Sequence, residues 1–304
     1  MQYKNHLSDF HIWDQKDHAE EWLIFPENIG EKLSIDETAV SNGELYTIVT
    51  NKQAKGKKGA LIAIIHGTKS SEIIPILKKI PLEKRNEVKE ITMDMAGSME
   101  LISLDSFPCA TQVIDRFHVQ QLVSEAVQEV RIDLRREATK EENENIKQAK
   151  LEKLKYQSTI LQNGDTRKQL LARSRYLLFK PKSKWTERQC ERAGIVFQEY
   201  PETKKAYDIS MMFRSVYENS KTISKAKEQL DKWYKKIEDE KHDSFATAAE
   251  SIRLHETTIL NYFLNRSTNA SAESFNAKLK GFRAIVRGVR DKKFFLFRIT
   301  KLYG

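Results

Sequence analysis

The chain has 304 residues, of which 39% are hydrophobic, and this suits about two domains with sizeable cores and excludes wholesale disorder. No apolar run approaches the roughly 20 residues that a helix needs to cross a bilayer, so we expect no membrane insertion. Cys109 and Cys190 lie far apart without metal-ligand spacing, and the polar start carries no secretory signal. A reduced cytoplasm is therefore the expected location.

The net charge of +9 is concentrated near the C-terminus. Residues 266–304 contain ten Lys or Arg side chains against two acids, Glu273 and Asp291. A positive field around one conspicuous acid suggests that a polyanion, most commonly nucleic acid, is brought to a carboxylate site. A solvated basic tail is the alternative. Five phenylalanines favour a packed segment instead: Phe275, Phe282, Phe294, Phe295 and Phe297.

Residues 1–32 are predicted to form an N-terminal extension that docks through its aromatic side chains, Trp13, Trp22 and Phe25. Three histidines also lie in this stretch, but no cysteine and no regular histidine spacing accompanies them, so the sequence does not favour a zinc site there.

The next stretch predicts a mixed sheet. Residues 33–38 and 45–50 form two β-rich runs that flank an Asn42-Gly43 turn, which predicts a hairpin. The continuous apolar run at residues 60–67 is typical of a central strand buried on both faces. Further elements then alternate: a helix at 70–80, a strand at 88–93, a helix at 98–105 and a strand at 110–114. The expected fold class is α/β, with helices on the faces of a mixed sheet.

From residue 119 onward the apolar period changes from that of strands to that of helices. Further helical stretches are expected at about 186–193, 202–218, 221–239 and 243–263. We therefore predict an all-helical insertion at residues 119–255, between a first core part at 33–118 and a second core part at 256–304.

Three acids lie in comparable settings within these core parts. Asp36 lies within the first strand of the hairpin, and an isolated buried charge there would be very costly without a partner. Asp94 follows another strand, and Glu273 lies in a helix-like stretch. Two aspartates on strands and a distant glutamate on a helix suit a pair of divalent metal ions for phosphoryl chemistry. Alternation along the strand places Glu37 on the opposite face, which excludes it from this set.

Each acid also has a purely structural interpretation. Asp36 would cap a turn, Asp94 would cap the following helix, and Glu273 would pair with Lys278 or Arg266 on the surface.

Four blocks of sequence resemble the signature blocks of DDE-type insertion-sequence transposases, and the ISL3 group in particular. In chain order they are Ser34-Ile35-Asp36-Glu37, Thr92-Met93-Asp94-Met95, Ile114-Asp115-Arg116-Phe117-His118 and the block from Thr268 to Lys280. The resemblance covers about residues 30–304. It implies a ribonuclease H-like core interrupted by the helical insertion, and metal-dependent cleavage and strand transfer of DNA.

The resemblance also implies roles for individual residues. Asp36, Asp94 and Glu273 would be the catalytic residues and would hold two Mg²⁺ or Mn²⁺ ions. His118 would contact a phosphate, orient a carboxylate or transfer a proton, although it is equally a satisfied residue of a helical first turn that Asp115 caps. Asp115, Asn269 and Asn276 would support the site, with Asn276 orienting Glu273 or touching DNA. The expected DNA contacts are Arg116, Lys278, Lys280, Arg283, Arg287 and Arg290, the last four of which would share one helical face if the helix continued through them.

The expected partners are transposon-end and target DNA and a second copy of the chain, with association to the bacterial nucleoid when DNA is bound. Members of this group usually begin with a zinc-binding and helix-turn-helix region, which this sequence lacks. Either that region is encoded separately, and a separate end-recognition protein is then a further expected partner, or this is a shortened copy. Two other functions remain open: a structure-specific nuclease or resolvase of the same fold class, and a non-catalytic DNA-binding remnant of a transposase.

Overall fold

The computed structural model describes residues 3–41, 43–286 and 291–304. The chain divides into two compact units. The sheet unit consists of Met1–His118 and Thr257–Gly304, and the helical unit consists of Val119–Glu256. Within the described ranges, every helix is too short or too polar to cross a membrane.

The sheet unit contains six strands in the order β1-β4-β3-β2-β5-β6. Their bounds are Trp22–Ile24, Lys32–Ser41, Glu44–Asn51, Leu61–His66, Glu90–Met93 and Thr111–Ile114 for β1 to β6. The pairs β1–β4, β4–β3 and β3–β2 are antiparallel, whereas β2–β5 and β5–β6 are parallel. The predicted mixed α/β sheet is confirmed.

The hairpin of β2 and β3 pairs from Leu33 with Asn51 to Ser41 with Glu44. Asn42 lies outside the described residues. Gly43 has a φ of +81°, a conformation that costs glycine little because it has no Cβ.

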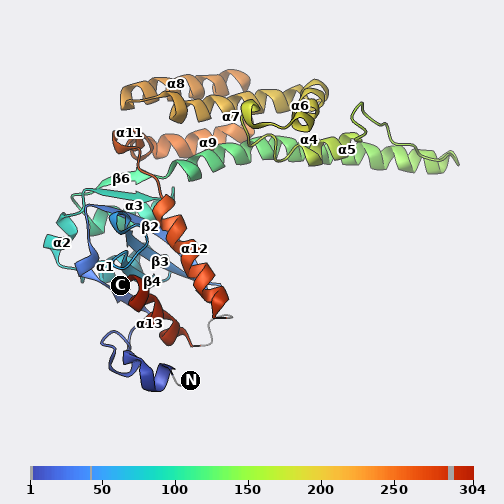
Figure 1. Ribbon diagram of the computed structural model, residues 1–304. Coiled ribbons are helices and arrows are strands. Elements are labelled where there is room, and N and C mark those ends of the chain that lie inside the picture. The colour runs from blue at the N-terminus through green and yellow to red at the C-terminus, as the bar shows by residue number, and fades with distance from the viewer. Residues whose placement is uncertain (1–2, 42, 287–290) are drawn as a thin grey trace. The chain divides into compact units, whose positions relative to one another are not determined.

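Both faces of the sheet are covered by helices of the same unit. Helices α1 (Ser70–Leu77) and α3 (Gly97–Ser106) pack on one face around Ile35, Ile91 and Met93. Helices α12 (Ala270–Ile285) and α13 (Lys292–Tyr303) pack on the other, and α12 lies beside β2 (Figure 1). The apolar run of β4 is buried on both faces, as its sequence predicts. The short α2 (Leu82–Asn86) leads into β5.

The N-terminal residues belong to the sheet unit more closely than the sequence predicts. Short helical turns form at Tyr3–Leu7, Asp9–Ile12 and Pro26–Asn28, and another follows β3 at Lys52–Ala54 (η4). The predicted aromatic docking is present, with the rings of Phe10 and Phe294 5.3 Å apart and those of Trp13 and Phe297 5.4 Å apart. Strand β1, however, was not predicted, because three residues are too few to show alternation.

The helical unit consists of packed helices connected by loops. Its bounds are Arg116–Leu151 for α4, which begins in the sheet unit, then Arg167–Arg173, Glu187–Glu199, Pro201–Asn219, Ile223–Glu240 and Asp243–Leu254 for α5 to α9, with a short turn at Lys182–Lys184. Helices α7 and α8 lie side by side (Figure 1), and the buried Trp233 indole donates to the carbonyl of Ile209 at 3.0 Å.

The helix predicted at 243–263 is instead three helices. Helix α9 ends at Leu254 and is followed by α10 (Glu256–Leu260) and α11 (Tyr262–Asn265), and the sheet unit resumes at the second residue of α10, Thr257. At the first break, His255 has φ −106° and ψ 16°, which lie outside the helical range. The apolar spacing continues across this break, and for this reason the sequence predicts a single helix.

Candidate functional site

Asp36 and Asp94 are brought together by the parallel pairing of β2 with β5. Lys32, Leu33 and Ser34 pair with residues 58 positions later in the chain, and the same offset separates Asp36 from Asp94. Asp94 follows the last residue of β5 directly. The two carboxylates therefore lie at neighbouring positions at one edge of the paired segment.

Glu273 reaches this region on the first turn of α12. Two polar contacts hold that helix on the sheet. The buried carboxylate of Asp115, directly after β6, accepts from the backbone N–H of Asn269, the N-cap of α12, at 3.2 Å. One turn beyond Glu273, the Asn276 amide donates to Oδ2 of Asp36 at 2.7 Å. Asn276 was expected to orient Glu273 or touch DNA, and its contact with Asp36 was not predicted.

The pKa of Asp36 depends on its burial and on the charges of the other two predicted acids, Asp94 and Glu273. Burial raises the pKa of its half-buried carboxyl, and the charges of Asp94 and Glu273 raise it further. The Glu37 N–H, which donates to Asp36 at 2.8 Å, and the charge of His118 act in the opposite direction. Asp36, Asp94, Glu273 and His118 thus share one electrostatic environment.

The three acids are near one another without forming a closed ligand set. Across residues 3–41, 43–286 and 291–304, no three His, Cys, Asp or Glu side chains are grouped tightly enough to hold a metal ion. Glu273 is exposed, and Asp94 accepts from the Ala96 N–H at 3.1 Å, so it also supports the turn into α3. Asp94 does not cap α3 itself, because the N-cap is Ala96 and receives no side-chain cap hydrogen bond.

Comparison with known proteins identifies the family. The family model described as a transposase, of the ISL3 type of DDE transposases, matches residues 33–299. The chain belongs to this transposase family. No curated protein and no solved structure matched the chain. Membership supports a transposase function in general and DNA as the substrate.

The transposase presents three different side chains on the first turn of α4. Against the rise that burial causes, the charge of His118 lowers the pKa of Asp36. Arg116 donates to the Tyr262 hydroxyl at 3.4 Å. Between them Phe117 is 59% exposed, with its ring edge-on to that of His118 at 5.8 Å. Sequence analysis gave Phe117 no role. Its exposure could have been predicted, because Phe117 is a large apolar residue that lies outside the apolar stripe beginning at Val119.

The basic residues predicted to contact DNA have different surroundings. Lys278 and Lys280 are both exposed, and Lys278 donates to the Gly56 carbonyl at 2.7 Å. Arg283 is half-buried and donates to the Val40 carbonyl at 3.5 Å. Arg287 and Arg290 lie outside the described residues. Because α12 ends at Ile285, the predicted shared helical face is described only for Lys280 and Arg283.

A charged pair near α12, formed by the half-buried Lys52 and the buried Glu90, was not predicted from the sequence. Lys52 of η4 and Glu90 of β5 lie 3.7 Å apart. Burial lowers the pKa of the Lys52 ammonium, which the Glu90 charge opposes. Burial opposes ionisation of Glu90, but hydrogen bonds from Ser267 and Asn265 and the lysine charges keep its pKa below the ordinary value. The signal was available, because Glu90 is an acid within a predicted strand and needs a partner for the same reason as Asp36.

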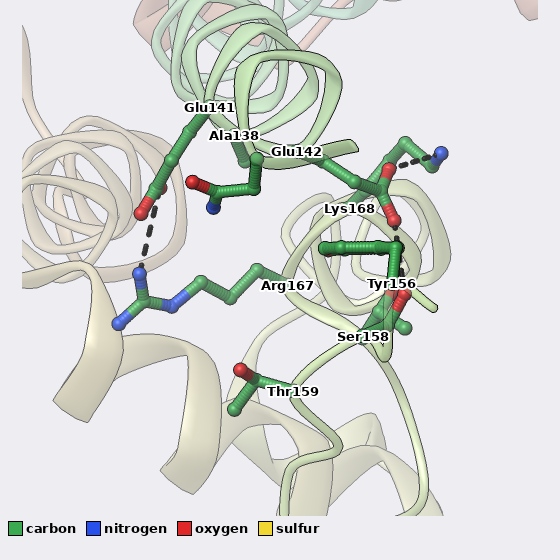
Figure 2. Close-up of a pocket in the computed structure, with 10 residues that line it drawn as sticks. Ala138, Glu141, Glu142, Tyr156, Ser158, Thr159, Arg167 and Lys168 are labelled. Carbon is green, nitrogen blue, oxygen red and sulfur yellow. Dashed lines mark hydrogen bonds and ion pairs between the residues drawn. The ribbon is translucent and has the colours of Figure 1, made fainter. Parts of the chain in front are cut away.

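The helical unit also contains a cleft of about 140 Å³, lined by α4, the start of α5 and the loop between them. Figure 2 shows its charged side chains pointing toward one another. Arg167 lies 3.5 Å from Glu141, and Lys168 pairs with Glu142. These charges satisfy each other, so the cleft offers less reactive chemistry than the acidic group of the sheet unit.

Proposed function

We propose that this transposase cleaves DNA at the ends of an insertion sequence and joins them to target DNA by metal-dependent phosphoryl transfer. Asp36, Asp94 and Glu273 are the proposed metal ligands and catalytic residues. The observation that carries the proposal is geometric. The parallel pairing of β2 with β5 brings Asp36 and Asp94 to neighbouring positions, and Asn276, one turn from Glu273 on α12, donates to Asp36.

The sheet topology supports a ribonuclease H-like core, which we propose for this unit. Strands β4, β3 and β2 form an antiparallel series, and β5 and β6 extend it in parallel. The proposed core is interrupted between α4 and α10 by the helical unit, which we interpret as an insertion.

The acids suit a pair of Mg²⁺ or Mn²⁺ ions in the chemistry of their donor atoms. Hard divalent cations prefer oxygen ligands, and a cation offsets the repulsion that raises the pKa of Asp36. A bound pair would activate water or a DNA 3′-hydroxyl and stabilise the leaving oxygen.

Three other residues of the site act on these acids or on the helix that carries Glu273. Asn276 orients Asp36, Asp115 fixes the start of α12, and the charge of His118 favours the ionised form of Asp36. His118 is suited to contact a phosphate beside the acids. Arg116, Lys278, Lys280 and Arg283 are proposed phosphate contacts, which supply salt-sensitive affinity and little sequence choice. Self-association on paired DNA ends is also part of the proposal.

To test the proposal, the protein is incubated with a DNA donor, a target plasmid and Mg²⁺ or Mn²⁺. The donor carries the sequences that flank the protein's own gene. We expect cleaved ends to be joined to the target. Asp36→Asn, Asp94→Asn and Glu273→Gln should each lower the rate about a thousandfold, because metal stabilisation of the transition state contributes several kcal/mol. Glu83→Gln, an exposed acid of α2, is the matched control.

The products separate the alternatives. Cutting without joining identifies a nuclease or resolvase. DNA binding without cutting identifies a non-catalytic remnant. If all three acid variants retain the wild-type rate, the catalytic assignment is wrong.

A further inference from the structure

The face of the sheet beneath the start of α12 is polar. Ser34 of β2 pairs in register with Thr50 of β3 on one side and with Thr92 of β5 on the other. All three hydroxyl residues are buried. They lie on the α12 face, because Ser34 and Asp36 share one side of β2 and Asp36 contacts Asn276 of α12.

The pair of Lys52 and Glu90 connects this polar face to the segment that precedes α12. The side chains of Lys52 and Glu90 are only 14% and 4% exposed. Lys52 donates to Thr92 Oγ1 at 2.7 Å and to Ser267 Oγ at 3.1 Å. Glu90 accepts from the Ser267 hydroxyl with one oxygen and from the Asn265 amide, at 3.0 Å, with the other. One ion pair therefore binds η4, β5 and the chain between α11 and α12.

Apolar packing holds the later turns of α12. Phe275 and Leu279 are buried among Tyr46, Ile48 and Ile64 of the sheet. Such packing is non-directional, so it resists separation of the helix more than sliding or rotation. Hydrogen bonds to charged groups are directional and short-ranged, so they restrict a segment to one register.

A buried ion pair is weak evidence for stability. The cost of removing two charges from water often exceeds their attraction, and apolar residues of similar volume frequently serve as well. The presence of an ion pair here is better explained if the pair holds the segment before α12 in one position among several that apolar packing allows. Ser267 precedes Glu273 by less than two helical turns, and the Asn269 N–H in between is fixed by Asp115.

We propose that Lys52 and Glu90 are positioning residues that fix the register of α12 through Ser267 and Asn265, and so deliver Glu273 to Asp36 and Asp94. This inference rests on the proposed function of the three acids. It assigns neither residue a contact with the metal or DNA.

The decisive variant replaces both charges with apolar side chains, Lys52→Met together with Glu90→Leu, in the full chain. We expect thermal stability close to that of the wild type but faster hydrogen exchange at residues 267–273. We also expect Mn²⁺-dependent nicking of supercoiled plasmid, at saturating Mn²⁺, to fall about a hundredfold, because displacement of a catalytic group by about 1 Å costs that much. A purely structural role predicts that a variant of wild-type stability keeps wild-type activity.

Two further variants complete the design. Ser267→Ala removes the link to α12 without leaving a charge unpaired, and it gives the answer if the double variant does not fold. Lys89→Met together with Glu31→Gln removes an exposed ion pair at the neighbouring strand position and is the matched control.

The outcomes are distinct. Unchanged exchange at residues 267–273 in both the double variant and Ser267→Ala overturns the positioning role, whatever the activity. Faster exchange with unchanged nicking also overturns it. If the wild type does not cut DNA at all, the proposed function fails, and the exchange measurement still decides whether the pair fixes α12.

Discussion

Both units contain local and remote charged contacts, but local pairs on one helix are far more frequent in the helical unit. In the helical unit many ion pairs link residues one turn apart on exposed helix surfaces, among them Lys204–Asp208, Lys225–Glu228, Lys227–Asp231 and Lys236–Glu240. In the sheet unit the important polar contacts join residues remote in sequence, such as Asn276 with Asp36 and Asn269 with Asp115. Pairs of the first kind require only a helix, whereas contacts of the second kind exist only in the complete fold. We therefore expect the remote contacts to carry function and the local pairs to contribute little.

The largest difference is expected at Asp115. Asp115→Ala leaves the Asn269 N–H without its acceptor, which should lower the free energy of unfolding by about 1–3 kcal/mol. It should also slow DNA cleavage about a hundredfold through displacement of Glu273. Urea denaturation and plasmid nicking measure the two effects. Asp115→Asn retains an acceptor oxygen and should recover most of both losses, and a variant that loses stability alone would contradict the positioning of α12 by Asp115.

A smaller effect with a distinctive sign is expected at Asp36. Because burial raises its pKa in the folded state, folding favours the protonated carboxyl. The stability this provides is complete below the unfolded-state pKa of about 3.9 and is lost as the pH rises through the higher folded-state value. In EDTA, Asp36→Asn should therefore be more stable than the wild type at pH 7, and the gain should disappear below about pH 3.9. Urea denaturation at the two pH values tests this, and a loss of stability at pH 7 would show that the Asn276 hydrogen bond outweighs burial.

The smallest effect is expected for a local pair of the helical unit. Asp208→Asn removes the partner of Lys204 on the exposed surface of α7. Surface pairs of this kind contribute at most about 1 kcal/mol, and salt screens them. We expect a change of unfolding free energy within that limit and an unchanged rate of DNA cleavage. A loss of activity comparable with that of Asp115→Ala would remove the distinction between the two units.

The same distinction explains what could be predicted from the sequence. The strand pattern and the long helices depend on local periodicity, so the mixed sheet and the change of period after residue 118 were predictable. The acids Asp36, Asp94 and Glu273 were singled out because a charge within a strand requires a partner and because their blocks resemble a family. Which residue serves as the partner depends on tertiary packing. The contact of Asn276 with Asp36 and the link between Lys52, Glu90 and Ser267 were therefore not predicted.

Strand β1 also affects how this transposase is divided for study. The family match begins at residue 33, yet Trp22–Ile24 pairs with Ala63–Ile65 along the outer side of β4. An uncovered outer strand presents free backbone N–H and C=O groups to any other extended chain. A fragment trimmed to the family boundary would expose the six-residue β4 in place of the three-residue β1 as the outer strand, and we expect it to aggregate more readily than the full chain.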